Sequence, residues 1–486
     1  MIGGKYTYFG LKEGLTHTLS EQDTSKYDHF EISLNIDGLP IFKSKNLTMW
    51  PLQCAVINID EVKNSPFVVA LFSGAKKPND LEFLRDFMEE LQELMETGFK
   101  GKRIVLKNII CDAPARALIK GIVQFNGRYG CDFCDVKGVH ESKMLFLYKG
   151  NLRTNESFRQ KTNPEHHKTD SILLNLDIDM IRQFPIDPMH CVDRGVTKRM
   201  LMLWKEGPLA HRLSAGHLST ITYFHQAVRH HIPPEFNRKP RGLDELKHWK
   251  ATEFRTFLLY TGPVILKYVL DKEKYIHFLS LSIGMRILYS ENLMEHRDYA
   301  DELLTYFVEK GSSLYSMSFI SYNVHCLLHL TDVANYNRSL HYCSAYKFEN
   351  NMGQIKRFIR GSSDPLIQVA NRLAERQAIS SSKKSNVNSG TPKTKECYRM
   401  TNDSYCLIHG VQENLIFCEV FCRMEPLYTK PCDSRIIGIF KGFRNHTKML
   451  HTDTTQLRHK AIMIPLSLID KDEYNVVALI PLMHSV

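Results

Sequence analysis

The sequence predicts a protein of the α/β class: a mixed sheet near the N-terminus, a large mainly helical insertion and a small β-rich part at the C-terminus. Two observations support this prediction. Over the first 135 residues, short β-branched and apolar runs alternate with amphipathic helical patterns, which is typical of layered α/β domains. Beyond residue 400, only short strand-like runs occur, and a polar, Ser-rich stretch typical of a flexible linker precedes them.

Strand-like segments lie early in the chain, and the first of them ends in the turn signal Gly-Leu-Pro. The expected strands cover residues 31–42, 52–59, 67–72 and 103–111. The loop 73–80 follows the third strand, and Asp80 is the expected N-cap of a helix over 81–95 that stops at Gly98. A second helix is expected from Ala115 to about residue 125.

This order gives three antiparallel strands, a crossover helix and a further parallel strand, which is the front of an RNase H-like sheet. From residue 136, helical patterns dominate, for example at 218–231, 253–270 and 274–288. The expected domains are 1–135 (first part of the core), 136–335 (helical insertion), 336–378 (completion of the core with its final helix), 379–400 (linker) and 401–486 (β-rich, with runs at 405–409, 415–421, 436–440 and 461–465).

The composition is that of a globular protein with a modest excess of basic residues. The formal net charge of +10 suits a nucleic-acid partner, because Lys and Arg displace counterions from phosphates. No run reaches the ~18 apolar residues of a membrane span, and the N-terminus lacks the features of a signal peptide. We therefore expect the chain in the cytoplasm or nucleus, with its 12 cysteines mostly reduced.

Two aspartates lie where a two-metal phosphoryl-transfer site needs acids. Asp37 lies late in the first expected strand, and Asp112 lies at the end of the fourth, just before a helix. Carboxylates at the ends of adjacent strands can hold divalent cations such as Mg²⁺, which prefer oxygen ligands. Each residue also has a simpler interpretation, since Asp-Gly is a common hairpin signal and Asp112 is a natural helix N-cap.

Several strings resemble the transposases of the CACTA (En/Spm) superfamily, and more closely the animal transposase domain-containing proteins. They are DGLPIFKSKNLTMWP, PFVVALFSGAKKPN, IICDAPARALIKG with GRYGCDFCDVKG, FPIDPMHCVDRGVTKRMLMLW, HWKATEFRTFLLYTGP, NVHCLLHL and SAYKFENNMGQIKR. The resemblance covers about Gly3 to Arg360, and CDAPAR and CxxC are its most specific pieces. It implies an RNase H-like DDE core that an insertion interrupts before the final helix, and metal-dependent cleavage and transfer of DNA strands in the nucleus.

The resemblance also implies roles for particular residues. Asp37 and Asp112 match the first two catalytic acids, which would hold Mg²⁺ or Mn²⁺. For the third acid, Glu349 is favoured over Glu253, because Glu253 lies in a segment whose apolar residues indicate packing. Glu349 opens an expected helix over 349–360. Basic residues that follow on this helix could face a DNA phosphate; they are Lys356, Arg357 and Arg360. The implied partners are transposon ends and further copies of the chain, with no membrane and no small-molecule substrate.

Cys131 and Cys134 have the spacing of a zinc knuckle and follow a Gly-rich turn. Two cysteines are half a zinc site, and the candidate partners are His166, His167 and His190. The alternative is a pair of reduced cysteines in a turn, and a thiol-redox role is disfavoured because no thioredoxin-like helix follows.

His325 and His329 share one helical face, but their apolar setting favours an interpretation as core histidines. The chain has no Walker A loop, GxSxG elbow or dinucleotide fingerprint, which argues against nucleotide hydrolases and serine hydrolases.

Two rival functions remain. The chain starts almost at the GGKYTYFGL segment, so we expect an N-terminal region that recognises transposon ends to be missing. A co-opted or truncated DNA-binding protein without catalysis is therefore the main alternative. A nuclease acting on RNA is the second, because the RNase H fold permits either substrate.

Overall fold

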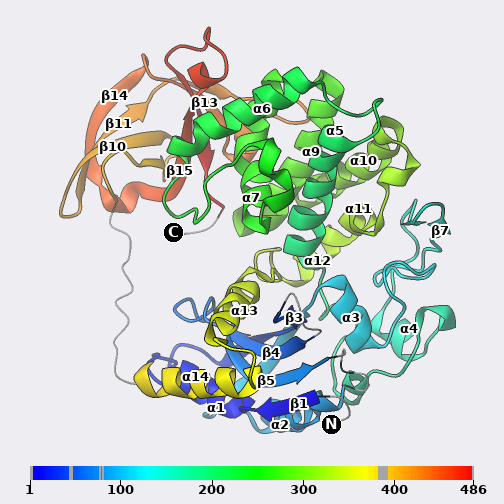
Figure 1. Cartoon of the computed structure of the whole chain (residues 1–486). Helices are drawn as coiled ribbons and strands as arrows, with labels where there is room; N and C mark the ends of the chain where they lie inside the picture. The colour runs from blue at the N-terminus through cyan, green and yellow to red at the C-terminus, as the bar shows by residue number, and fades with distance from the viewer. Residues whose placement is uncertain (1–3, 43–46, 76–77, 79–80, 381–391, 484–486) are drawn as a thin grey trace. The chain divides into compact units, whose positions relative to one another are not determined.

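The computed structural model describes residues 4–42, 47–75, 78, 81–380 and 392–483, and it confirms the mixed α/β class. The chain forms two compact units (Figure 1). The first unit comprises Met1–His190 and Asp332–Ser385, and the second comprises Cys191–Thr331 and Asn386–Val486. The expected cap Asp80 and residues 381–391 of the expected linker lie outside the described residues.

The first unit is built on one mixed sheet with the strand order β1-β5-β4-β2-β6. The strands are β1 (Gly4–Tyr8), β2 (His29–Ile36), β4 (Thr48–Val56), β5 (Phe67–Gly74) and β6 (Arg103–Ile110), and the short β3 (Leu39–Pro40) pairs with β4. Strand β2 is antiparallel to β4 and parallel to β6. The expected strands are all present, whereas β1 was not expected.

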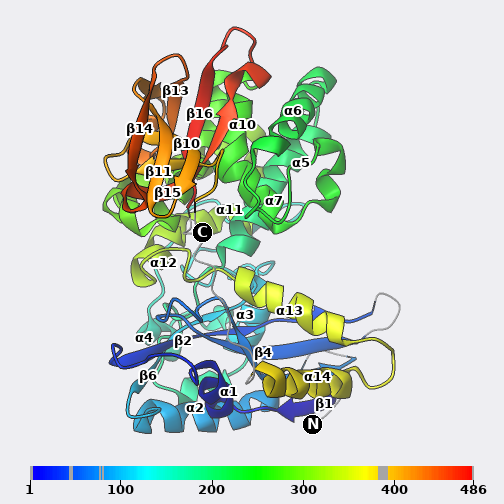
Figure 2. The ribbon, with the colours of Figure 1, turned by 90° about the vertical axis from the view of Figure 1, so that its left-hand side faces the viewer.

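Helices cover both faces of this sheet, so its central strands are buried along nearly their whole length. The helices are α1 (Leu11–Thr18), α2 (Arg85–Thr97), α3 (Ala113–Lys120), α13 (Tyr346–Phe358) and α14 (Pro365–Ser380). Figures 1 and 2 show α2 below the sheet and α13 above it. Apolar side chains from β4, β5, α13 and α14 form one core cluster, made by Ile41, Met49, Val68, Leu71, Ile355, Leu366 and Val369.

Two expected helix boundaries were wrong. Helix α3 ends at Lys120 rather than near residue 125, because Gly121 takes a left-handed conformation with φ 68° and stops the helix. Helix α13 begins at Tyr346, so Glu349 lies within its first turn instead of opening it.

Residues 121–188, which follow α3 in the first unit, are mostly irregular. They contain β7 (Val139–His140), β8 (Met144–Leu145) and α4 (Asn155–Arg159). Near their end the chain returns to the sheet: the Ile109 amide donates to the Gln183 carbonyl at 2.7 Å, and Cys111 forms a parallel bridge with Ile186. Asp187 therefore leaves the sheet beside Asp112.

The second unit combines helices with a separate sheet. Its helices are α5 (Lys198–Glu206), α6 (Ala215–Ala227), α7 (Ala251–Thr256), α8 (Gly262–Ile265), α9 (Lys272–Tyr289), α10 (Arg297–Tyr315) and α11 (Tyr322–Cys326), and α12 (Leu330–Tyr336) follows them. The described helices include none with the length and apolarity that crossing a bilayer requires.

The C-terminal sheet has eight strands in the order β12-β13-β16-β15-β9-β10-β11-β14. They are β9 (Cys397–Met400), β10 (Tyr405–Gln412), β11 (Leu415–Phe421), β12 (Met424–Pro426), β13 (Phe440–Phe443), β14 (Thr447–Asp453), β15 (Leu457–Pro465) and β16 (Val476–Pro481). The strand expected at 436–440 was wrong, because Ser434–Ile437 form a 3-10 turn and β13 starts only at Phe440.

Candidate functional site

Asp37 and Asp112 lie at one edge of the first unit's sheet. Asn35 of β2 pairs with Ile110 of the parallel strand β6, and each aspartate follows two residues later. Because the carboxyl ends of parallel strands meet at the same edge, the two carboxyl groups are neighbours. Asp112 also caps α3, since its Oδ1 accepts a hydrogen bond of 2.7 Å from the Ala115 amide. The helix-cap interpretation of Asp112 is thus confirmed, and the cap uses one carboxylate oxygen.

Helix α13 places Glu349 next to Asp37. One potential ligand atom from each of Asp37, His190 and Glu349 lies within 4.8 Å of the others. His190 Nε2 is 3.5 Å from Glu349 Oε1. The side chains of His190 and Glu349 are 21% and 33% exposed, so solutes can reach the cluster. This arrangement can hold a cation.

Asp187 fixes the ring of His190. Its Oδ2 lies 2.6 Å from His190 Nδ1, and its Oδ1 accepts a hydrogen bond of 2.9 Å from the Ala345 amide. Asp187 is buried. Through these two contacts it connects the segment that carries His190 to Ala345, the residue just before α13. The sequence reasoning placed His190 among the zinc ligands and missed Asp187. The spacing Asp-x-x-His at the start of a helical pattern was the available signal.

Burial and nearby charges change the pKa of two groups in this cluster. Burial, together with repulsion from Asp112 and Glu349, raises the pKa of Asp37 to about 7, although His190 opposes this rise. Burial alone lowers the pKa of His190, but hydrogen bonds with Asp187 and Glu349 outweigh burial and raise it to about 11. In the metal-free protein, the His190 imidazolium is thus the positive charge among these carboxylates.

Glu253, the alternative third acid, forms its contacts with Arg241 and Lys250. It is buried, and its two oxygens accept hydrogen bonds of 2.6 and 2.8 Å from Arg241. The Lys250 amide donates to Oε2 as well, at 2.8 Å. Glu253 therefore has the contacts of a structural ion pair at the start of α7.

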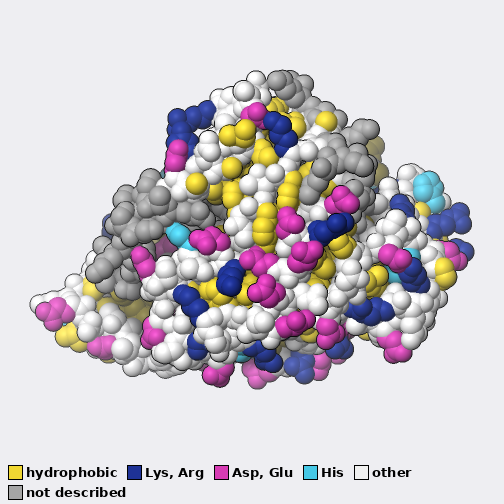
Figure 3. Space-filling model, turned by 90° about the horizontal axis from the view of Figure 1, so that it is seen from below, with side chains coloured by type: hydrophobic (Ala, Val, Ile, Leu, Met, Phe, Trp, Pro, Cys, Tyr) yellow, Lys and Arg dark blue, Asp and Glu magenta, His cyan; other side chains and the backbone are white. Residues whose placement is uncertain are grey.

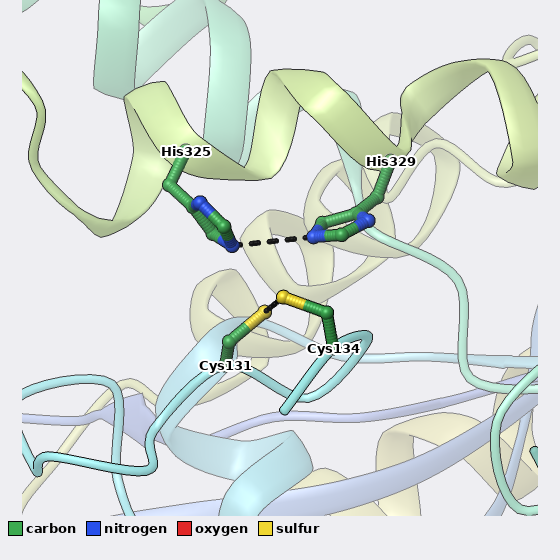
Figure 4. A group of neighbouring side chains, drawn as sticks. All are labelled: Cys131, Cys134, His325 and His329. Atoms are coloured by element: carbon green, nitrogen blue, oxygen red, sulfur yellow. Dashed lines mark hydrogen bonds between the residues drawn. The ribbon is translucent and has the colours of Figure 1, made fainter. Parts of the chain in front are cut away.

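Four buried side chains form a group that could bind a metal such as zinc. They are Cys131, Cys134, His325 and His329, and one ligand atom from each lies within 4.8 Å of the others. The two Sγ atoms are 3.6 Å apart, and the two Nε2 atoms are 3.2 Å apart. Figure 4 shows both pairs pointing toward a common centre. A Cys₂His₂ donor set is typical of structural zinc sites.

The histidines expected to complete the zinc site have other neighbours. His166 Nδ1 donates to the Tyr129 carbonyl at 2.7 Å, and burial lowers the pKa of His166 to about 3, so its ring is neutral. The ring of His167 packs against Phe158, with 4.7 Å between the centroids. His190 belongs to the acidic cluster described above. The structure thus brings His325 and His329, which were interpreted as core histidines, to the two thiols instead.

Asp132, between the two cysteines, anchors their loop. It is buried and forms ion pairs with Arg116, at 2.9 Å, and with Lys120, both from α3. Since Asp112 caps the same helix, the cysteine loop and the second acid share one rigid support.

The basic residues after Glu349 are on the surface. Arg357 and Arg360 are exposed, and Lys356 is exposed but donates to the Pro40 carbonyl at 2.7 Å. Helix α13 ends at Phe358, so Arg360 lies beyond it. Elsewhere, on the face seen from below, basic and acidic side chains of the described residues are interspersed (Figure 3).

Comparison of the chain with protein-family models and with curated protein sequences finds no match.

Proposed function

We propose that the chain is a transposon-derived DDE-type transposase, which cleaves and transfers DNA strands with Mg²⁺ or Mn²⁺ held by Asp37, Asp112 and Glu349. The observation that carries this proposal is the convergence of three acids from β2, β6 and α13 at one sheet edge. Acids on separate elements repel one another when they are brought together in a partly buried site, and a divalent cation offsets that cost.

The strand order supports the proposal. Strands β5, β4 and β2 are successive antiparallel neighbours, and β6 lies parallel to β2 on the other side. An RNase H-like sheet has this order. Helix α13 supplies its acid only after the long segment that follows α3, which agrees with an insertion before the final helix of such a fold.

The chain's own residues suit a divalent cation. Asp37 and Glu349 offer oxygen donors, and Asp112 has a second carboxylate oxygen besides the one that caps α3. When bound, Mg²⁺ or Mn²⁺ would activate water or a DNA 3′-hydroxyl and stabilise the leaving oxygen of the phosphodiester. Asp187 would keep His190 beside Glu349. A structural Zn²⁺ held by Cys131, Cys134, His325 and His329 belongs to the same proposal.

The proposal includes DNA ends as partners, a homo-oligomer that pairs them and a nuclear location. Manganese-dependent nicking of supercoiled plasmid tests its centre. Asp112→Asn and Glu349→Gln should lower the nicking rate roughly 10²–10³-fold while the protein stays folded. Glu253→Gln is the matched control, because Glu253 binds Arg241, and it should nick at close to the wild-type rate once folded. Nicking that survives Glu349→Gln and disappears in Glu253→Gln would reverse the assignment of the third acid.

The alternative function is a co-opted DNA-binding protein without catalysis. The contact between His190 and Glu349 favours it, because an imidazolium beside Glu349 competes with a metal for that carboxylate. Wild-type protein that binds DNA but nicks it at no Mn²⁺ concentration would establish this alternative.

A further inference from the structure

Three buried or half-buried amide side chains form a hydrogen-bonded relay through the first unit's sheet. Asn351 Nδ2 donates to Gln53 Oε1 at 2.8 Å, and Gln53 Nε2 donates to Asn35 Oδ1 at 3.0 Å. Asn35 Nδ2 then donates to the Ile110 carbonyl at 2.9 Å. Gln53 Nε2 also lies 3.4 Å from the Phe348 carbonyl. The relay thus connects α13, β4, β2 and β6, all of which are labelled in Figure 2.

Each end of the relay lies next to an acid. Asn35 lies on β2, two residues before Asp37, and Ile110 is the last residue of β6, two residues before Asp112. On α13, the Phe348 carbonyl directly precedes Glu349. Asn35 is the direct cross-strand partner of both Gln53 and Ile110, so sheet register sets these contacts.

The donors of the relay all run in one direction, which fixes the orientation of every amide. Gln53 and Asn35 are fully buried. Turning either amide would put donor against donor or acceptor against acceptor, and an unsatisfied buried polar group costs about 1–3 kcal/mol. The sheet therefore holds α13 through a directional contact as well as through the apolar cluster around Ile355.

We propose that Gln53 is a positioning residue for the metal site: it sets the placement of α13, and thereby the distance between Glu349 and Asp37. Strand β4 carries none of the three acids, so Gln53 acts only through Asn35 and α13. This inference rests on the proposed function, because it assigns Gln53 to the same site. Removing a group that orients a metal ligand typically weakens metal binding 10–100-fold.

The same sheet provides a matched control. Ser33 Oγ donates to Asn108 Oδ1, and Asn108 Nδ2 donates to Asn337 Oδ1 at 3.0 Å. These residues are equally buried and also join β2 to β6, but they lie four residues before the aspartates and bond to neither Glu349 nor its neighbours on α13. Ser33→Ala therefore removes a similar buried hydrogen bond without releasing α13.

The test is a titration of the full-length, zinc-loaded chain with Mn²⁺, with free Mn²⁺ measured by electron paramagnetic resonance. Asp37→Asn identifies the binding that belongs to the acids. Gln53→Met keeps the side-chain size but removes every hydrogen bond, and it should raise the dissociation constant for Mn²⁺ about 10–100-fold. Gln53→Glu should do the same because it turns the donor into an acceptor, whereas Ser33→Ala should stay within about twofold.

Hydrogen exchange across 346–358 is a second readout, independent of metal. It should speed up in Gln53→Met and remain as in wild type in Ser33→Ala. If Gln53→Met does not fold, Asn351→Ala, at the half-buried end of the relay, takes its place with a smaller shift in the same direction.

The outcomes separate the two proposals. Wild type without Asp37-dependent Mn²⁺ binding would overturn the proposed function, and the role of Gln53 with it. Wild type that binds Mn²⁺ through Asp37, beside folded Gln53→Met and Asn351→Ala proteins with unchanged affinity, would overturn only the positioning role.

Discussion

The guanidinium of Arg286 donates a hydrogen bond of 2.9 Å to the carbonyl of Pro481, 195 residues further along the chain. A second hydrogen bond of 2.9 Å goes to the Leu259 carbonyl, and the ring of Tyr260 lies 5.5 Å from the guanidinium. Arg286 is fully buried, and burial lowers its pKa. One side chain of α9 thus connects the last strand of the C-terminal sheet to the helices of the same compact unit.

Arg286→Met should destabilise the protein by about 2–3 kcal/mol, because it leaves two buried carbonyls without their charged donor. Urea unfolding measures this loss. Arg286→Lys should recover little, since an ammonium lacks the planar fork that reaches both carbonyls. Arg435→Met is the control, because Arg435 makes an exposed ion pair with Asp433, and its unfolding midpoint should match wild type. Equal midpoints for both methionine variants would contradict the role of Arg286.

Acid should destabilise the second unit through His277. Burial lowers the pKa of His277 to about 4, below the usual value near 6.5. The unfolded chain therefore binds this proton more tightly than the folded one, so stability falls as the pH drops below about 6.5 and stops falling near 4. His277 alone should lower the free energy of unfolding by about 2 kcal/mol between pH 7.5 and pH 5.

Thermal unfolding at the two pH values measures this effect. His277→Gln should be less stable than wild type at pH 7.5 and should lose less stability at pH 5. Phe307→Leu removes the ring stacked on His277, at 4.1 Å, without removing the titrating group. Relative to wild type, Phe307→Leu should lose about the same stability at both pH values. If His277→Gln keeps the wild-type pH dependence, His277 is not the group responsible.

The isolated chain should contain about one zinc per molecule. Cys134→Ser and His329→Ala should each lose the metal and lower the melting temperature, because the site joins four buried side chains. His166→Gln should keep zinc, since His166 bonds to the Tyr129 carbonyl, and exposed Cys422→Ser serves as the cysteine control. Atomic absorption measures the zinc content of each variant and so decides between the two ligand sets. Loss of zinc in His166→Gln but not in His329→Ala would support the ligands expected from the sequence.

Arg357→Ala with Arg360→Ala should weaken DNA binding and reduce the salt dependence of the affinity by about one to two counterions. Both side chains are exposed close to the end of α13. Fluorescence anisotropy over a salt series measures the slope, with Arg435→Ala as the exposed control. Unchanged slopes would remove these two residues from the interface. Equal affinity for random RNA would favour the nuclease on RNA over the transposase.

Local patterns predicted much of the first sheet, because apolar residues recur throughout β2, β4, β5 and β6, and clear turns separate these strands. Helix α1 was missed because Gly14 weakens its helical pattern. A Cβ at Gly14 would lie 2.1 Å from the ring of Phe67, so packing requires glycine where helix propensity disfavours it. Strand β1 was missed because five residues at a sheet edge carry little periodic signal.

The candidate site was predictable where strand order decides it, and not where distant segments meet. Asp37 and Asp112 follow neighbouring strands, so their proximity could be inferred. His190 and Glu349 lie 159 positions apart, and only the folded chain brings them within 3.5 Å. His325 and His329 do lie in a buried, apolar setting. This setting encloses all four candidate zinc ligands, so it does not argue against metal binding.

Asp112 caps α3 and is also a proposed metal ligand, and this combination has a consequence for the evolution of such chains. A copy that no longer cuts DNA would still be selected to keep aspartate, asparagine or serine at this position, because helix α3 needs its cap. Glu349 caps no helix and is partly exposed, so an inactive copy that lost it would lose only the contact with His190. Under the proposed function, a glutamate at 349 is therefore a better marker of retained catalysis than an aspartate at 112.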